Sequence, residues 1–475
     1  GTAAPWCVDT WGIDGGLSSR YPVSVKGMQK AIGIPLQLYA PYFCPESPYF
    51  NATSKWNKVS SNSSLQSCSM FDFENVSPEQ SRAFYDEFFD RGIQAGMVSY
   101  ESDFMNQNFN CVPEFMTTSH AALMWQHGMA NAAAARNISI QWCMATPSDL
   151  LASVDMPAVT NFRVSTDFCY GNSWEIGVSS LLAWALGSAP SKDTLWTTNN
   201  NKTAILGCSW TTDHEALAAE LHVILALMST GPVGISDADG MTNATLLKRA
   251  IRTDGALLKP AKSITAIDSS FLNSSKAGLQ GYIYGTAGYI GRAWHFVSFK
   301  LKEPYFVRMR DFWPPIASSK TNDDIILAYR DFHRSPLCRH GSDAITTDCV
   351  KLVHVNDKDD SSKEIFIAPR SSFSNVTQGS DFFPTLTTVW RSCYPKNDWI
   401  FMGELDKYVP LSPIRFMNIG CIEAGVAVEL QGVSGEEIKL TSIDANMKVV
   451  VHKVVIPKSG STIISLRKQG VVDVK

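Results

Sequence analysis

Hydrophobic runs of two kinds divide the chain. In residues 1–265, short apolar runs alternate with stretches in which apolar residues recur at helical spacing, and this alternation predicts a parallel α/β architecture. The predicted strands are residues 6–11, 36–42, 97–104, 139–144, 161–165, 182–186 and 233–236, and the predicted helices include residues 78–91, 118–136 and 213–228. Seven such units in a row favour a (β/α)8-type (TIM) barrel over an open sheet.

After about residue 270 the pattern changes to β-forming runs separated by turns of Gly, Asn, Asp and Ser. The runs that predict strands are residues 281–284, 294–301, 364–367, 385–390, 426–430 and 447–456, and the polar residues 356–363 predict a loop. We therefore expect a catalytic barrel domain over residues 1–268 and a C-terminal antiparallel β-sandwich-like domain over residues 269–475.

Composition and charge exclude two classes of partner. The net charge of −4 comes without a basic block or an acidic tail, so nucleic acid is not an expected partner. The longest apolar stretch, residues 221–235, contains His222 and is interrupted by Gly231 and Pro232, whereas a membrane span needs about 20 apolar residues. We therefore expect no membrane span in a chain of 475 residues that is long enough for two or three domains.

Sequons and cysteines predict passage through an oxidising compartment, which is that of a secreted or lysosomal protein. Eight Asn-x-Ser/Thr sites predict N-glycosylation, at Asn51, Asn62, Asn75, Asn137, Asn201, Asn243, Asn273 and Asn375. The eleven cysteines lack zinc-type spacing, so no metal site is expected, and Cys338 with Cys349 is interpreted as a loop disulfide. Because eleven is odd, at least one thiol is free or pairs with another chain.

Carboxylates at the ends of two predicted strands are the candidate catalytic groups. The run 97–104 ends with Glu101 and Asp103, which are two residues apart and so face the same side of a strand. The run that follows two strands later carries Arg163 and Asp167. Barrel enzymes gather such strand ends into one mouth, and two carboxylates there suit glycoside hydrolysis, in which one attacks the anomeric carbon and the other protonates the leaving oxygen. The alternative is that Glu101 and Asp103 begin a solvated loop and Arg163 pairs with a nearby acid.

Several motifs resemble those of clan-D-type glycoside hydrolases, the α-galactosidases and raffinose synthases. Residues 161–168 resemble their Arg-x-x-x-Asp segment on strand six, whose Asp is the general acid/base, and residues 140–150 look like their strand five. Glu101-Ser-Asp103 lies where these families have Lys-x-Asp, with the Asp as nucleophile. Residues 6–11 resemble their Asp-Asp-x-Trp strand two, and residues 229–237, followed by 254–260, resemble their last strand and its exit. The resemblance covers about residues 5–265.

This resemblance implies a secreted retaining glycosidase for terminal α-linked sugars, with Asp103 as nucleophile and Asp167 as acid/base. The residues expected to bind the sugar are Asp9, Trp11, Glu101, Trp142, Arg163 and Asp237. The mechanism needs no cofactor, and a transglycosidase would use the same residues. Glu101 replaces the family's Lys and Asp9 alone remains of its Asp pair, so two alternatives stay open. Glu101 is the nucleophile instead of Asp103, or the chain is a catalytically decayed glycan-binding or structural glycoprotein.

The same resemblance places residues 6–11 at strand two of the barrel. The chain begins with Gly-Thr-Ala-Ala-Pro, without Met or a signal peptide, which predicts that a preceding segment was removed. We therefore expect an N-terminal companion chain or segment to supply strand one, because a barrel that lacks a strand exposes two edges. The alternative is that residues 6–11 are themselves strand one and that a later strand is not apparent from the sequence.

Overall fold

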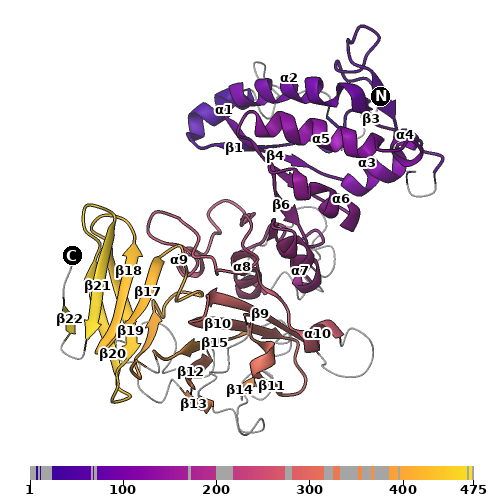
Figure 1. Cartoon of the computed structure of the whole chain (residues 1–475). Helices are drawn as coiled ribbons and strands as arrows, with labels where there is room; N and C mark the ends of the chain where they lie inside the picture. The colour runs from indigo at the N-terminus through magenta and orange to yellow at the C-terminus, as the bar shows by residue number, and fades with distance from the viewer. Residues whose placement is uncertain are drawn as a thin grey trace. The chain divides into compact units, whose positions relative to one another are not determined.

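The computed structural model describes residues 7–8, 11, 24–65, 68, 72–168, 173–198, 218–272, 281–314, 325–331, 351–355, 365–367, 384–393, 396–467 and 470–472 (Figure 1). The chain divides into two compact units. Unit 1 comprises residues 1–164 and 182–190, and unit 2 comprises residues 165–181 and 191–475.

Unit 1 is built on a parallel sheet with the strand order β1-β4-β5-β6-β7. These strands are β1 (Leu36–Tyr39), β4 (Met97–Ser102), β5 (Ser139–Trp142), β6 (Val159–Arg163) and β7 (Ala189–Ser191), and a short antiparallel hairpin pairs β2 (Lys58–Ser60) with β3 (Glu74–Val76). The helices are α1 (Val25–Ile32), α2 (Ser81–Gln94), α3 (Met105–Cys111), α4 (Pro113–Thr117), α5 (Ala121–Ala134) and α6 (Pro147–Ala152), with 3-10 turns η1 (Pro78–Gln80) and η2 (Ser153–Asp155). The predicted α/β architecture is confirmed, and closure into a barrel stays a prediction.

Helices α2 and α5 lie side by side over one face of this sheet (Figure 1). Helix α2 presents Phe84, Tyr85, Phe88 and Phe89 at spacings of one and four residues, and all four are buried. Each such aromatic ring stabilises the fold by about 1.5–3 kcal/mol. The two helices approach closely at Gly128, where a Cβ atom would lie 2.7 Å from the backbone nitrogen at residue 82.

Three predicted strands of the α/β part differ from the structure. Residues 182–186 lie within helix α7 (Gly177–Ala185) and the turn after it, and the strand follows as β7. The Leu and Ala residues of this run favour a helix, which stops before Gly187 at a φ of 86°. Within the described residues, the runs 6–11 and 233–236 form single parallel bridges, Val8 with Phe43 and Ile235 with Leu195.

Disulfides secure both ends of the region that follows β1. Cys7 bonds to Cys44 beside the Val8–Phe43 bridge, and Cys68 bonds to Cys111 at the end of α3. Among the described residues, Cys143 is a buried free thiol. Cys338 and Cys349 lie outside the described residues, so their disulfide stays a prediction. None of the helices that the structure describes is long and apolar enough to cross a membrane.

Unit 2 is rich in antiparallel β-structure, as the sequence predicted for its C-terminal part. One sheet has the order β13-β12-β15-β10-β9-β8, two others have the orders β16-β19-β20 and β17-β18-β21-β22, and β11 pairs with β14. The strands are β8 (Thr265–Ala266), β9 (Tyr282–Tyr289), β10 (Ala293–Phe299), β11 (Tyr305–Val307), β12 (Ile325–Asp331), β13 (Lys351–Val355), β14 (Ile365–Ile367), β15 (Thr385–Arg391), β16 (Ile400–Gly403), β17 (Phe416–Ile422), β18 (Gly425–Gln431), β19 (Glu437–Ile443), β20 (Val449–Val455), β21 (Ser461–Arg467) and β22 (Gly470–Val472). The helical elements are α8 (Ala219–Met228), α9 (Ala244–Lys248), α10 (Asp268–Leu272) and η3 (Met309–Asp311). The predicted loop at residues 356–363 lies outside the described residues.

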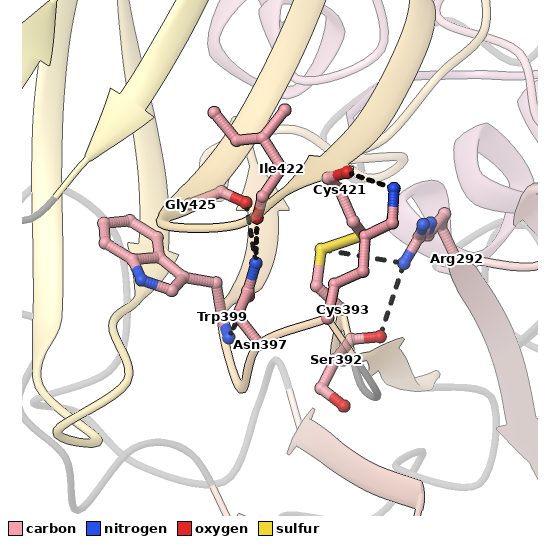
Figure 2. The surroundings of a disulfide bond; sticks show 9 residues. Arg292, Ser392, Cys393, Asn397, Trp399, Cys421, Ile422 and Gly425 are labelled. Atoms are coloured by element: carbon pink, nitrogen blue, oxygen red, sulfur yellow. Dashed lines mark hydrogen bonds between the residues drawn. A yellow bond between two sulfur atoms is a disulfide. The ribbon is translucent and has the colours of Figure 1, made fainter.

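The sheets β16-β19-β20 and β17-β18-β21-β22 share one hydrophobic core. Alternate residues of β18 and β19, among them Val428 and Leu440, point into it. A third disulfide, between Cys393 and Cys421, joins the segment after β15 to strand β17 (Figure 2). Beside it, the Asn397 amide donates to the backbone oxygens of Ile422 and Gly425, at 3.0 Å for the latter. The covalent bond and these hydrogen bonds fix the β17–β18 turn.

The segment before residue 268 packs directly on the β-rich part within unit 2. The Lys407 ammonium donates to the backbone oxygens of Lys248 and Ile251 at 2.7 and 3.1 Å, at the carboxyl end of α9. The Ser412 hydroxyl donates to the Lys259 oxygen at 2.6 Å. These contacts join residues on both sides of the expected boundary at 268/269, which stays a prediction.

Candidate functional site

The candidate site lies on the polar face of the parallel sheet in unit 1. Strand alternation sends Tyr100 toward Phe88 and Phe89 of α2, so its neighbours Ser99 and Glu101 face the other way. Parallel strands that are covered on both faces are apolar throughout, and this sheet departs from that pattern. Its polar residues are Gln37 and Tyr39 on β1, Ser99 and Glu101 on β4, Gln141 on β5 and Asn161 and Arg163 on β6.

Asp103, the expected nucleophile, follows β4 and is held by two donors. The Tyr39 hydroxyl donates to Oδ2 at 2.9 Å, and the backbone N–H of Phe104 donates to Oδ1 at 2.6 Å. Asp103 is 8% exposed, whereas Tyr39 is 41% exposed. Desolvation and the negative charge of Asp103 together raise the pKa of Tyr39, so the phenol stays protonated and remains a donor. The arrangement fixes the direction of a nearly buried carboxylate.

Glu101 lies two residues earlier on the same face and is paired differently. Its Oε2 accepts a 2.8 Å hydrogen bond from Nε2 of Gln37, and the Ser99 hydroxyl donates to Oε1 of Gln37 at 3.2 Å. Glu101 is half-buried and is in register with Tyr39 across the β1–β4 ladder. The two carboxylates therefore have separate donors, an amide for Glu101 and a phenol for Asp103.

The free thiol of Cys143 lies at the end of the next strand, β5, close enough to Asp103 for the negative charge of that carboxylate to act on it. Burial raises the pKa of this thiol well above its usual range, and the negative charge of Asp103 raises it further. The positive charge of Arg163 has the opposite effect and lowers the pKa of this thiol, by less than burial raises it. The Cys143 thiol thus lies close enough to Asp103 and Arg163 for both charges to act on it, and the roles of Asp103 and Arg163 at a sugar site stay predictions.

Asp167, the expected acid/base, lies in unit 2 on a segment that its neighbours fix. The backbone N–H of Phe168 donates to Oδ2 of Asp193 at 2.6 Å, and the N–H of Asp193 donates to the Ser165 hydroxyl at 2.8 Å. Asp167 itself is exposed, while the Phe168 ring is buried against Trp196. Asp193 therefore supports the segment that presents Asp167.

Asp237 lies just after the Leu195–Ile235 bridge, where a strand end was expected. Its Oδ1 accepts from the backbone N–H of Thr197 at 2.9 Å, and its Oδ2 accepts from the Thr197 hydroxyl. The carboxylate thus links two segments of unit 2, and its expected contact with sugar stays a prediction.

Two tryptophans that were expected to bind sugar are packed in the core of unit 1. The Trp142 side chain is fully buried and contacts Phe162 edge to face, with ring centroids 6.0 Å apart. It shares its face of β5 with Ile140, so alternation turns it away from Gln141 and the polar face. The Trp11 ring packs against Phe88 of α2 in a tilted arrangement, at 3.9 Å between ring centroids. Both side chains therefore stabilise the helix-covered face in this structure.

Four of the expected glycosylation sites among the described residues are accessible, and one is buried. In Asn51-Ala-Thr53 and Asn62-Ser-Ser64 the asparagine Oδ1 accepts from the backbone N–H and the hydroxyl of the third residue. Asn137 and Asn243 are exposed, but Asn75 is only 1% exposed. Asp9, Asn201, Asn273 and Asn375 lie outside the described residues. Within the part of the chain that the structure describes, no group of His, Cys, Asp and Glu side chains has the arrangement of a metal site.

Comparison with known proteins adds only a remote likeness in fold. No protein-family model and no curated protein matches this chain. The chain is similar to a solved α-galactosidase from Thermus thermophilus in complex with stachyose, with a TM-score of 0.34 and 13% identity over 48% of this chain and 52% of that chain. It is also similar to a glycoside hydrolase family 5 protein from Bacteroides vulgatus, with a TM-score of 0.20 and 10% identity over 65% of this chain and 86% of that one. The chain thus spans about half the length of the α-galactosidase, and the functional argument rests on the residues of the site.

Sequence reasoning did not identify Tyr39 or Gln37 as contributors to the site. Alternation in residues 36–39 was a usable signal, because Gln37 and Tyr39 are the positions that alternate with Leu36 and Leu38. Their partners on β4 depend on the register between two strands, which a single sequence does not specify.

Proposed function

We propose that this chain is a retaining glycoside hydrolase for terminal α-linked sugars, in the manner of the α-galactosidases that its motifs resemble. The observation that carries the proposal is the nearly buried carboxylate of Asp103, held by Tyr39 and by a backbone N–H at the end of β4. A carboxylate that is fixed in this way and faces polar side chains is suited to attack an anomeric carbon. Glu101 and Arg163, on the same face, supply charged groups for sugar hydroxyls.

In the proposed reaction, Asp103 attacks the anomeric carbon while Asp167 protonates the leaving oxygen, so the glycosidic bond breaks and a glycosyl ester forms on Asp103. Asp167 then takes a proton from water, which hydrolyses the ester and frees Asp103. This mechanism requires the two carboxyl groups to lie about 5–5.5 Å apart in the active protein. Asp193 supports the segment of Asp167, and Asp9 and Asp237 are proposed to bind sugar hydroxyls.

The proposal requires neither a metal nor an organic cofactor, and a sugar acceptor in place of water would make the protein a transglycosidase. Three disulfides among the described residues are typical of an oxidising compartment, which supports a secreted or lysosomal location. Glycans found at Asn51 and Asn62 would support the same location.

The test is a panel of aryl α-glycosides with wild type, Asp103→Ala and Asp167→Asn. We expect both variants to lose turnover, with azide restoring part of it for Asp103→Ala by replacing the missing carboxylate. A 2-fluoro glycoside that traps the ester should label the peptide that contains Asp103. Asp155→Asn, an exposed acid on η2, is the matched control and should behave as wild type.

Two other outcomes would redirect the proposal. A label on Glu101 would make that residue the nucleophile and leave the class of enzyme unchanged. Sugar binding without turnover across the whole panel would favour the alternative, a glycan-binding protein on a decayed scaffold.

A further inference from the structure

Two buried asparagines connect the chain segments that carry Tyr39 and Asp103. Asn75 on β3 and Asn108 on α3 are each 1% exposed, and Nδ2 of Asn75 donates to Oδ1 of Asn108 at 2.6 Å. Nδ2 of Asn108 in turn donates to the backbone oxygens of Pro41 and Asp103, at 3.2 and 3.3 Å. One amide therefore joins the chain just after β1 to the chain just after β4.

The chemistry of this contact fixes its direction. Only the NH2 group of Asn108 can donate to two carbonyl oxygens, so its Oδ1 must face Asn75, whose own NH2 group supplies the donor. A buried amide that lost these partners would leave polar groups unpaired away from water, which is destabilising. The two asparagine side chains therefore have one possible orientation. Strand β3 is also joined to the segment that follows β1, by two backbone hydrogen bonds between Phe43 and Glu74 at 3.0 and 2.9 Å.

The Asn75–Asn108 pair, here called the clamp, lies next to the segments that carry Tyr39 and Asp103. The Ala40 N–H donates to the backbone oxygen of Glu101 at 3.0 Å, and Asn108 joins the carbonyl groups of Pro41 and Asp103, which lie one and two residues further along these segments. The Tyr39 hydroxyl reaches Asp103 across the same two chains. A small separation of the two strand ends would lengthen this hydrogen bond and turn the carboxylate.

We propose that Asn75 and Asn108 are positioning residues for Asp103, which hold the ends of β1 and β4 together so that the Tyr39 hydroxyl stays on the carboxylate. The catalytic consequence rests on the proposed function, and the clamp itself does not. Asn75 also begins a glycosylation sequon, and a glycan on Nδ2 would need a buried side chain to reach solvent. The same proposal therefore requires Asn75 to carry no glycan in the mature protein.

The experiment compares Asn108→Ala with wild type by two independent measurements. Hydrogen exchange followed by mass spectrometry should show faster exchange in the peptides that contain residues 40–44 and 103–105. Turnover of an aryl α-glycoside should show kcat lowered roughly tenfold with KM nearly unchanged, because the sugar still binds but the nucleophile is misplaced. Gln126→Ala is the matched control, since Gln126 is also a buried amide, donating to Asp149 at 2.8 Å. It should lower stability without either local effect.

Asn75→Ala is the milder variant, to be used if Asn108→Ala does not fold, and should give the same pattern with smaller changes. Faster exchange together with unchanged kcat would overturn the positioning role, and unchanged exchange at both strand ends would overturn the clamp. A glycopeptide that carries a sugar on Asn75 would also overturn it. If wild type turns over no glycoside, the proposed function fails, and hydrogen exchange alone still decides the clamp.

Discussion

The Tyr39 hydroxyl donates a 2.9 Å hydrogen bond to Oδ2 of Asp103, a residue 64 positions later in the chain. The bond crosses from β1 to the end of β4, and the parallel register that pairs Tyr39 with Glu101 makes it possible. A phenol whose pKa is raised is a dependable donor at neutral pH, so the carboxylate keeps a fixed direction.

Tyr39→Phe removes this donor and leaves the ring in place. A hydrogen bond to a charged group contributes about 1.5–3 kcal/mol, so kcat/KM for an aryl α-glycoside should fall about 10- to 100-fold. Tyr282→Phe is the matched control, because that hydroxyl donates to Glu175 at 2.8 Å in unit 2. Equal losses in both variants would mean that Tyr39 acts through general stability and not through Asp103.

Glu101→Lys tests whether the charge of this half-buried side chain acts on a sugar bound at the proposed site. We expect it to change the ratio of kcat/KM between neutral and amino-sugar aryl glycosides by more than about tenfold, because one unit of charge changes sign near the substrate. The free energy of unfolding should change by less than about 1 kcal/mol, since Glu101 is only half-buried. Glu114→Lys makes the same charge change on the exposed start of α4 and is the matched control, which should leave the ratio unchanged. Unchanged kinetics for Glu101→Lys would place Glu101 outside the sugar subsite.

The strands of the sheet were predictable because their signal is local. Four apolar runs predicted β1, β4, β5 and β6 to within a few residues. The acidic residues that close the second run made Asp103 a candidate, and its catalytic role stays a prediction. Residues 182–186 were misassigned because a short apolar run of Leu and Ala has no periodicity that separates helix from strand.

The parts of the site that depend on tertiary structure were not predictable. Trp142 was expected at the mouth, but the face it occupies is set by the pleat and by the helices that cover Ile140. Asn75 matches a sequon perfectly, and only the structure shows that it is buried against Asn108. Register and burial are properties of packed elements, and a single sequence does not record them.

Cys143 should be unreactive in the folded protein, since the thiol is buried and its pKa is raised. Thiolate is the reactive form, so alkylation by iodoacetamide at pH 8 should be on the order of 1,000-fold slower in native than in unfolded protein. Mass spectrometry of peptides labelled before and after unfolding measures the ratio, and Cys143→Ser is the control for background labelling. Rapid labelling of native protein would contradict the described burial.

Arg415 lies fully buried between two carboxylates in unit 2, and its removal should be strongly destabilising. Its Nε donates to Glu404 at 2.9 Å and its Nη2 to Glu436 at 2.7 Å. Arg415→Met leaves both acids without their guanidinium partner, which should lower the free energy of unfolding at pH 7 by about 3–5 kcal/mol. Arg136→Met, which breaks a more exposed pair with Asp86 and Asp90, should cost about 1 kcal/mol or less.

The pH dependence of this loss follows from the two acids. Burial alone would raise the pKa of Glu436, but hydrogen bonds from Arg415 outweigh it and lower this pKa to about 2. The charged Glu436 therefore stabilises the fold above pH ~4.3, and this stabilisation is lost as the pH falls toward 2. Burial raises the pKa of Glu404 although Arg415 opposes the shift, and without Arg415 both acids would take up protons more readily on acidification. The deficit of Arg415→Met should therefore shrink between pH 7 and pH 3. Urea unfolding of both proteins across this range measures it, and a deficit that stays constant with pH would show that lost packing, and not charge, causes the destabilisation.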